Sequence, residues 1–124
     1  MADDAARRAV DQFLLDEIDS VPHLEALLLL WRKRPQLWTV EEVARALYVR
    51  DDIALVILRE LESKHLVAKS AQCYIYDSNV SRDKLIEALD SIYRRELVRI
   101  SNLIHSKASP SVRAFARAFR LKKD

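Results

Sequence analysis

The chain has no glycine among its 124 residues, and it has only three prolines and one cysteine. Walker-type phosphate loops and dinucleotide-binding fingerprints need glycine, because only a residue without a Cβ lets the backbone turn tightly beside a phosphate. Both kinds of nucleotide-binding motif are therefore excluded. The scarcity of glycine and proline, the two weakest helix formers, also predicts a mostly helical chain.

Long apolar runs are also missing. The longest covers residues 26–31, far short of the roughly 20 residues of a membrane-spanning helix. The opening MADDAARRAV has no apolar segment of signal-peptide length. The single cysteine, Cys73, cannot form a disulfide within the chain. We therefore expect a protein of the reducing cytoplasm that makes no contact with a membrane.

Signs of catalytic or metal chemistry are equally scarce. The three histidines, His23, His65 and His105, are far apart and form no metal-binding spacing with one another or with the cysteine. Only a cluster assembled by tertiary folding would change this. The acidic pairs at 41–42 and 51–52 stand at a helix start and a turn, where the helix dipole favours them. We predict no metal site, no cofactor and no enzymatic activity.

The strongest pattern occupies residues 39–77, TVEEVARALYVRDDIALVILRELESKHLVAKSAQCYIYD. Thr39 and Glu42 have the spacing of a capping box, in which each side chain bonds the other residue's backbone N–H. Apolar residues then recur at helical spacing and predict helices over 39–48 and about 51–64. The predicted buried faces consist of Val40, Val43, Ala44 and Leu47 in the first helix, and Ile53, Ala54, Ile57, Leu58 and Leu61 in the second.

A small hairpin should follow the second helix. His65 stands where a helix commonly ends in a left-handed residue, a conformation that histidine tolerates better than most side chains. The apolar runs 66–68 and 73–76 are separated by the polar bend 70–72, which predicts two short strands.

Helix, turn, helix and hairpin in this order resemble the winged helix-turn-helix superfamily of bacterial transcriptional regulators, including the MarR-like proteins. The resemblance covers residues 24–77 and rests on a preceding apolar helix, on VARAL…V and on ILRELESKHLV. It implies a mostly α fold with a small β-hairpin wing, extended by helices at both ends. DNA binding is implied as well, because other proteins with this fold bind DNA. The predicted division is an N-terminal helix (1–19), a winged-helix domain (20–77), a long C-terminal helix (78–107) and a basic amphipathic tail helix (108–124).

Residues 81–106 predict one continuous helix of about 26 residues, about 39 Å long. Its apolar stripe is too long for the preceding domain to cover, and an uncovered stripe of this kind usually belongs to an interface. Because MarR-like regulators dimerise through helices outside the DNA-binding domain, the resemblance implies a homodimer. The alternative is that the C-terminal segment folds back on the stripe. The stripe consists of Ile86, Leu89, Tyr93, Leu97, Ile100 and Ile104.

Charge is distributed unevenly. Residues 1–93 carry 12 Lys and Arg against 17 Asp and Glu, whereas residues 94–124 carry 9 against 2. The basic part should meet an anionic partner, which is nucleic acid, an acidic protein surface or a second copy, unless it is simply a solvated helix face. In the tail we expect Arg113, Arg117 and Arg120 on one face, with Phe115 and Phe119 on the other.

In a helix-turn-helix protein the second helix enters the major groove of DNA. Here its outward face carries acids that repel phosphates, and apolar residues that cannot bond base edges. The residues expected to contact DNA or a partner are Arg50, Asp52, Leu55, Val56, Arg59 and Lys69. Two functions follow. One is a dimeric regulator that binds DNA weakly. The other is a protein–protein interaction adaptor that uses Leu55 and Val56 as an apolar contact.

Overall fold

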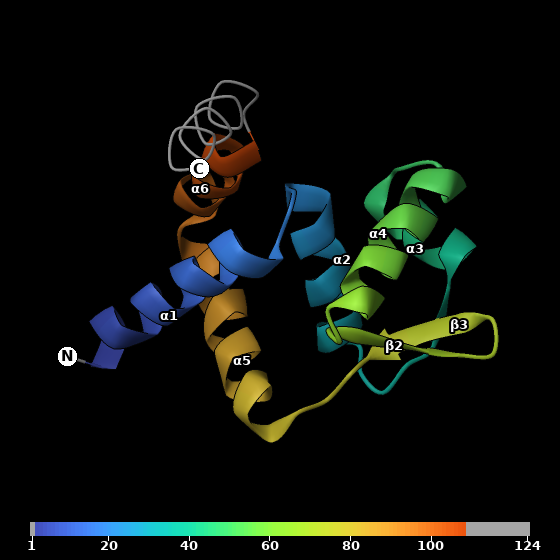
Figure 1. Cartoon of the computed structure of the whole chain (residues 1–124), viewed down its shortest axis with the longest axis horizontal. Coiled ribbons are helices and arrows are strands. Elements are labelled where there is room, and N and C mark those ends of the chain that lie inside the picture. Colours follow the sequence, from blue (N-terminus) through green and yellow to red (C-terminus); the bar gives the residue numbers. More distant parts are fainter. Residues whose placement is uncertain (1, 109–124) are drawn as a thin grey trace, which may run out of the picture.

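The computed structural model describes residues 2–108, and the predicted tail helix lies outside this range. The predicted fold class is confirmed, because helices dominate and a small antiparallel sheet forms the wing (Figure 1). In residues 2–108 we find no helix with the length and apolarity needed to cross a membrane. The elements are α1 (Ala2–Glu17), α2 (Val21–Arg32), β1 (Trp38–Thr39), α3 (Val40–Leu47), α4 (Asp51–Ser63), β2 (Val67–Ser70), β3 (Cys73–Tyr76), α5 (Val80–Arg95) and α6 (Leu97–Ala108).

The sheet has the order β1-β3-β2, and both pairings are antiparallel. Strands β2 and β3 form the predicted hairpin, with Val67 opposite Tyr76. Strand β1 adds to the other edge of β3, with Trp38 opposite Tyr74. The sequence did not predict β1, because two residues are too short to show the alternation of a strand.

Helix α2 occupies the centre of the molecule. Four of its five leucines are fully buried and lie in the same core as the inner faces of α3 and α4, and Leu29 packs against that core partly buried. The helix starts at Ser20, whose hydroxyl accepts a hydrogen bond from the backbone N–H of His23, and Pro22 stands in the first turn. Proline is harmless there because the first turn has no intrahelical partner for its missing N–H.

Three turns place residues other than glycine in the left-handed region. His65 has a φ of 60°, as the sequence predicted, and its N–H donates to the Glu62 carbonyl at 2.9 Å. Tyr48 (φ 58°) ends α3, and Ala71 (φ 55°) turns the hairpin. Each such residue costs roughly 1–2 kcal/mol relative to an ordinary helical conformation. A chain without glycine accepts this cost at these positions.

The prediction of one continuous helix over residues 81–106 is wrong. Helix α5 ends at Arg95, α6 begins at Leu97, and Glu96 between them has left the helical conformation (φ −129°, ψ 45°). Glu96 donates its N–H to the Ile92 carbonyl at 2.7 Å, and its own carbonyl accepts from Ile100 N–H at 3.0 Å. Backbone hydrogen bonding therefore continues on both sides of the bend.

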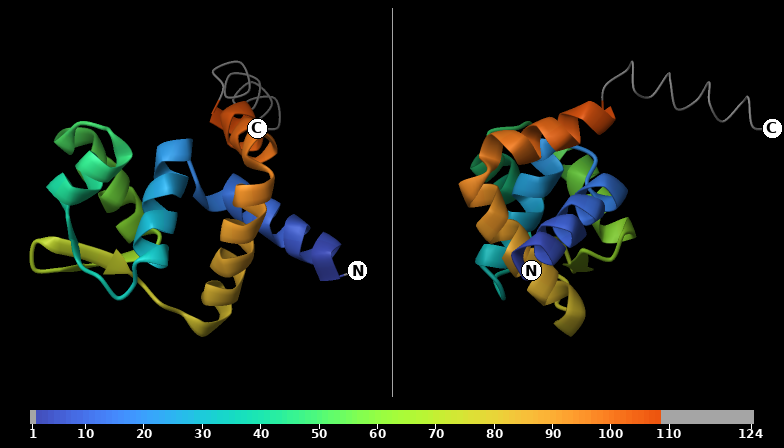
Figure 2. Two further views of the ribbon diagram at one scale, coloured as in Figure 1. Left: turned by 180° about the vertical axis from the view of Figure 1, so that it is seen from behind. Right: turned by 90° about the vertical axis from the view of Figure 1, so that its left-hand side faces the viewer.

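Helix α1 crosses this bend and packs on both α5 and α6 (Figures 1 and 2). Arg99 donates to Asp11 of α1 at 2.8 Å and to Glu96 at 2.5 Å, and Arg7 reaches Glu96 at 2.8 Å. The hydrogen bond from Arg99 holds the pKa of the Glu96 carboxyl below its usual range, against the opposing effect of burial. These ion pairs anchor α1 across the bend.

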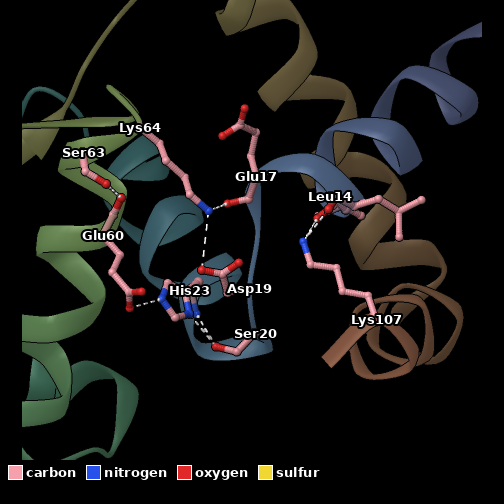
Figure 3. Close-up of polar contacts among 10 residues, drawn as sticks. Leu14, Glu17, Asp19, Ser20, His23, Glu60, Ser63, Lys64 and Lys107 are labelled. Atoms are coloured by element: carbon pink, nitrogen blue, oxygen red, sulfur yellow. Dashed lines mark hydrogen bonds and ion pairs between the residues drawn. The ribbon is translucent and has the colours of Figure 1, made fainter. Parts of the chain in front are cut away.

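The C-terminal end of α1 is held by two lysines, one directly after α4 and one in α6 (Figure 3). Lys64, directly after α4, donates to the Glu17 carbonyl at 2.6 Å. Lys107 of α6 donates to the carbonyls of Leu14 and Leu15 at 3.0 and 2.5 Å. Cations are favourable beside the negative end of a helix. Burial nevertheless lowers the pKa of Lys107.

The expectation of an uncovered apolar stripe is therefore wrong for most of its residues. Within the chain's own core lie Ile86, Leu89, Tyr93, Ile100 and Ile104. Leu97 alone among the six predicted interface residues is exposed, with 53% of its surface accessible. The physical reason is the bend at Glu96, which lets α5 and α6 close around α1 instead of extending past the domain.

Candidate nucleic-acid interface

Helices α3 and α4 form the helix-turn-helix, and the start of α3 has the predicted capping box. The Thr39 hydroxyl accepts from Glu42 N–H at 3.1 Å, and the Glu42 carboxylate accepts from Thr39 N–H at 2.8 Å. At the other end, Tyr48 turns the chain, and Val49 N–H returns to the Ala44 carbonyl at 3.0 Å. The chain then enters α4 at Asp51. Local hydrogen bonds thus set the angle between the two helices.

Replacing Thr39 with alanine should lower the free energy of unfolding by about 1 kcal/mol, because an orphan N–H of α3 loses its acceptor. Thr39→Ser keeps the hydroxyl and should lose much less. Urea denaturation followed by circular dichroism measures both variants. Equal losses for alanine and serine would show that the threonine methyl group, and not the cap, is what stabilises this end.

Helix α4 buries one face and presents the other. Ala54, Ile57, Leu58 and Leu61 are buried as predicted, whereas Arg59 is exposed. Ile53 was assigned to the buried face and departs from it, since 43% of its surface is accessible. It lies in the first turn of α4, where the helix projects beyond the core.

A groove of about 330 Å³ lies between α4 and the wing. Four of the predicted contact residues line it, namely Asp52, Leu55, Arg59 and Lys69. The remaining lining residues come from α3, the start of α4 and the wing and were not predicted: Val40, Glu41, Asp51, Gln72 and Tyr74. For Tyr74 a partial signal was available, because the hairpin register places it opposite Lys69, which was predicted as a contact residue.

The groove is nearly balanced in charge. Two cations, Arg59 and Lys69, face three acids, Glu41, Asp51 and Asp52. The two aspartates begin α4, where the positive end of the helix dipole stabilises them. Such a surface has no net attraction for a polyanion, so binding to one would depend on local contacts from the two cations.

Arg50, just outside the groove, is paired with Asp52. Its Nε donates to Asp52 Oδ1 at 3.0 Å, and its Nη2 donates to Asp52 Oδ2. The hydrogen bond from Arg50 lowers the pKa of the Asp52 carboxyl, and the same bond raises the pKa of the guanidinium. Asp52 Oδ1 also accepts from Ile53 N–H at 3.0 Å. The pairing orients Arg50 toward a carboxylate and away from a phosphate.

Three large apolar side chains are exposed at the helix-turn-helix turn and in the first two turns of α4. Tyr48 is 95% accessible, and Val56 is 53% accessible on α4. Together with Ile53 they form what we call the Tyr48 patch. Of its three members only Val56 was predicted as a contact residue. The sequence pointed to a turn near Tyr48 but contained no signal that its ring stands in solvent.

Outside this region, the fold brings Asp19, His23 and Glu60 together, with their ligand atoms within 4.8 Å of one another. Sequence spacing could not predict this group, because Glu60 is 37 residues from His23. The predicted tail residues Arg113, Phe115, Arg117, Phe119 and Arg120 lie outside residues 2–108.

The fold as a whole is that of MarR-family regulators. A MarR family protein of Mycobacterium tuberculosis superimposes with a TM-score of 0.56 at 19% identity, over 97% of this chain and 86% of that protein. MepR, a transcription regulator of the Staphylococcus aureus multidrug efflux pump MepA, gives 0.54 at 22% identity, over 99% and 91%. MepR bound to ethidium bromide gives 0.52 at 22% identity, over 99% and 89%. The sequence matches no protein-family model and none of the curated proteins. The predicted resemblance is confirmed for the fold.

Proposed function

We propose that this chain is a cytoplasmic transcription regulator that binds duplex DNA weakly as a homodimer. The observation that carries the proposal is the convergence of Arg59 from α4 and Lys69 from the wing on one groove. A winged helix places this surface against DNA, with the second helix in the major groove. The likeness of the fold to MepR, itself a transcription regulator, supports the same assignment.

The binding is weak because phosphate contacts are few. Affinity that does not depend on sequence grows with the number of phosphates a protein neutralises. Per chain the groove offers Arg59 and Lys69, while Arg50 is engaged by Asp52. Leu55 can touch a thymine methyl group but cannot hydrogen-bond a base edge. Low sequence preference follows.

A homodimer doubles these contacts. We place the contact with the second copy at the α5–α6 bend, where Leu97 and Val98 are exposed outside the winged-helix domain. The basic residues Arg113, Arg117 and Arg120 add phosphate contacts in this proposal, and Phe115 and Phe119 pack on protein. In this proposal, most of the cationic charge that reaches DNA comes from the C-terminal third of each chain.

A protein–protein interaction adaptor is the second candidate function. The exposed Tyr48 patch favours it, because aromatic and aliphatic side chains at the end of α3 and in the first two turns of α4 suit a protein surface better than a phosphate backbone. In this alternative the groove-lining Leu55 and the neighbouring Val56 contact the partner. DNA binding would then be absent even at low salt.

Fluorescence anisotropy with a random-sequence duplex tests the first proposal. The groove alone supplies about four phosphate contacts per dimer, so affinity should fall on the order of 100-fold between about 50 and 200 mM salt, and more steeply if the tail arginines also contact phosphates. Arg59→Ala should reduce affinity at low salt. Removal of residues 108–124 should reduce it more than Arg59→Ala does.

Two results would contradict the proposal. Absence of binding at 50 mM salt would favour the adaptor function. A complex that survives physiological salt and is lost on Arg59→Ala would show that α4 reads bases. Glu87→Gln, an exposed change on α5, serves as the control for charge effects far from the groove.

A further inference from the structure

A cluster of potential metal ligands lies where the α1–α2 junction meets α4 (Figure 3). Asp19 belongs to the junction, His23 to the first turn of α2, and Glu60 to α4. One ligand atom from each residue lies within 4.8 Å of the other two. None of the three lines the groove between α4 and the wing. The cluster is therefore separate from the candidate DNA surface.

The imidazole of His23 is held in a fixed orientation. His23 is only 9% accessible, and its Nδ1 lies 2.6 Å from the Ser20 hydroxyl. Its Nε2 lies 3.0 Å from Glu60 Oε1. The contact with Glu60 needs a proton on Nε2, because a carboxylate oxygen only accepts. An ion would take the place of that proton, and with Nδ1–H donated to the Ser20 oxygen the lone pair of Nε2 would then face the ion. Metal-binding histidines have this arrangement, in which a partner on one ring nitrogen orients the other toward the ion.

The two carboxylates lie at the solvent side of the cluster. The side chains of Glu60 and Asp19 are 45% and 43% accessible, so an ion can enter from solvent and keep water ligands. The Lys64 ammonium lies 3.5 Å from Asp19 Oδ2, although its shorter bond is to the Glu17 carbonyl at 2.6 Å. This ammonium offsets part of the negative charge that would otherwise attract a cation.

We propose that Asp19, His23 and Glu60 bind a divalent transition-metal ion, and that zinc is the ion they fit best. Zinc combines imidazole nitrogen with carboxylate oxygen at about 2.0–2.2 Å, whereas calcium and magnesium prefer oxygen ligands alone. The half-exposed carboxylates close on the ion by small side-chain rotations. Nε2 of His23 and one oxygen each from Asp19 and Glu60 are the protein ligands, and water completes the coordination.

The bound ion would connect α4 to the α1–α2 junction. Asp19 lies between α1 and α2, His23 lies in the first turn of α2, and Glu60 lies in α4. The ion would therefore add a bond between the helix that lines the wing groove and the junction through which α1 joins the winged-helix domain. The binding of zinc does not depend on whether the chain binds DNA.

Isothermal titration of the full chain with zinc chloride tests the site. We expect one zinc per chain. Glu60→Gln and Asp19→Asn should each weaken binding about tenfold or more, and His23→Gln should abolish it. Lys64→Met should strengthen binding, because it removes the competing ammonium beside Asp19. A lysine with only a structural role predicts lower stability for that variant and no gain in zinc affinity.

Matched controls separate this site from other zinc ligands. His65→Asn and His105→Gln remove exposed histidines, and Cys73→Ser removes the thiol, so all three should bind zinc as the wild type does. At a hundredfold excess over Kd, zinc should raise the melting temperature of the wild type by roughly 5–15 °C.

The half-exposed carboxylate variants decide the outcome even if His23→Gln does not fold. Unchanged zinc affinity in both Glu60→Gln and Asp19→Asn would overturn the proposal. So would loss of binding in Cys73→Ser, or the absence of saturable binding to the wild type.

Discussion

Ile100→Asp should unfold the chain, whereas Leu97→Asp should leave it folded and separate the two copies of the proposed homodimer. Ile100 is fully buried in the core that includes α1. The substitution removes about 1.5–3 kcal/mol of apolar burial and places an unpaired carboxylate in the core, at a cost of several kcal/mol more. A domain of this kind has only about 5–15 kcal/mol of stability in total. Circular dichroism and urea denaturation measure the loss.

Leu97 stands three residues earlier, and half of its surface is exposed at the α5–α6 bend. An aspartate there meets water in the monomer, so the fold should persist. In a dimer that uses this surface, the charge would be buried against the second copy. Sedimentation velocity should change from twice 14.4 kDa for the wild type to 14.4 kDa for the variant. Asn102→Asp adds the same charge at another exposed position of α6 and should keep the dimer.

Three results would contradict this pair of expectations. A wild-type chain that sediments at 14.4 kDa at micromolar concentration would refute the homodimer. A wild-type dimer that persists in Leu97→Asp would place the interface elsewhere. An Ile100→Asp variant that unfolds like the wild type would show that α1 does not hold the α5–α6 bend closed in solution.

Replacing both Asp51 and Asp52 with asparagine should strengthen binding to duplex DNA about tenfold or more at 50 mM salt. Each carboxylate at the start of α4 repels a nearby phosphate by up to about 1 kcal/mol in a watery environment, and this repulsion disappears in the double variant. The change also frees Arg50 from its pairing with Asp52. The salt dependence should become steeper, because one more cation per chain reaches a phosphate.

This variant should be less stable than the wild type, because two carboxylates leave the positive end of the α4 dipole. The ion pair between Arg50 and Asp52 is exposed, and such pairs contribute little. A triple variant that adds Arg50→Ala to the double substitution separates the two causes. The gain in DNA affinity that remains in the triple variant comes from the lost repulsion, and the part that disappears comes from Arg50. Anisotropy titrations at several salt concentrations measure both. Unchanged affinity in the double variant would show that DNA does not approach the leading end of α4.

Local features of this protein were determined by its sequence alone. The capping box at Thr39, the left-handed residue at His65 and the hairpin after α4 involve residues near one another in the chain, so short-range rules describe them. The buried face of α4 was predicted, except for Ile53 at its first turn. The winged-helix order of elements followed from these local signals, and the MarR-like fold that its resemblance implied is confirmed.

Tertiary structure decided what joins distant segments. The pattern of the apolar stripe from Ile86 to Ile104 does not reveal whether a second copy or α1 covers it. In the structure the bend at Glu96 lets α1 pack against α5 and α6, and most of the stripe is buried within the chain. The pairing of β1 with β3 and the approach of Glu60 to His23 likewise depend on how helices pack. Periodicity identifies which residues need a partner, but the partner is chosen by long-range packing, which no local pattern records.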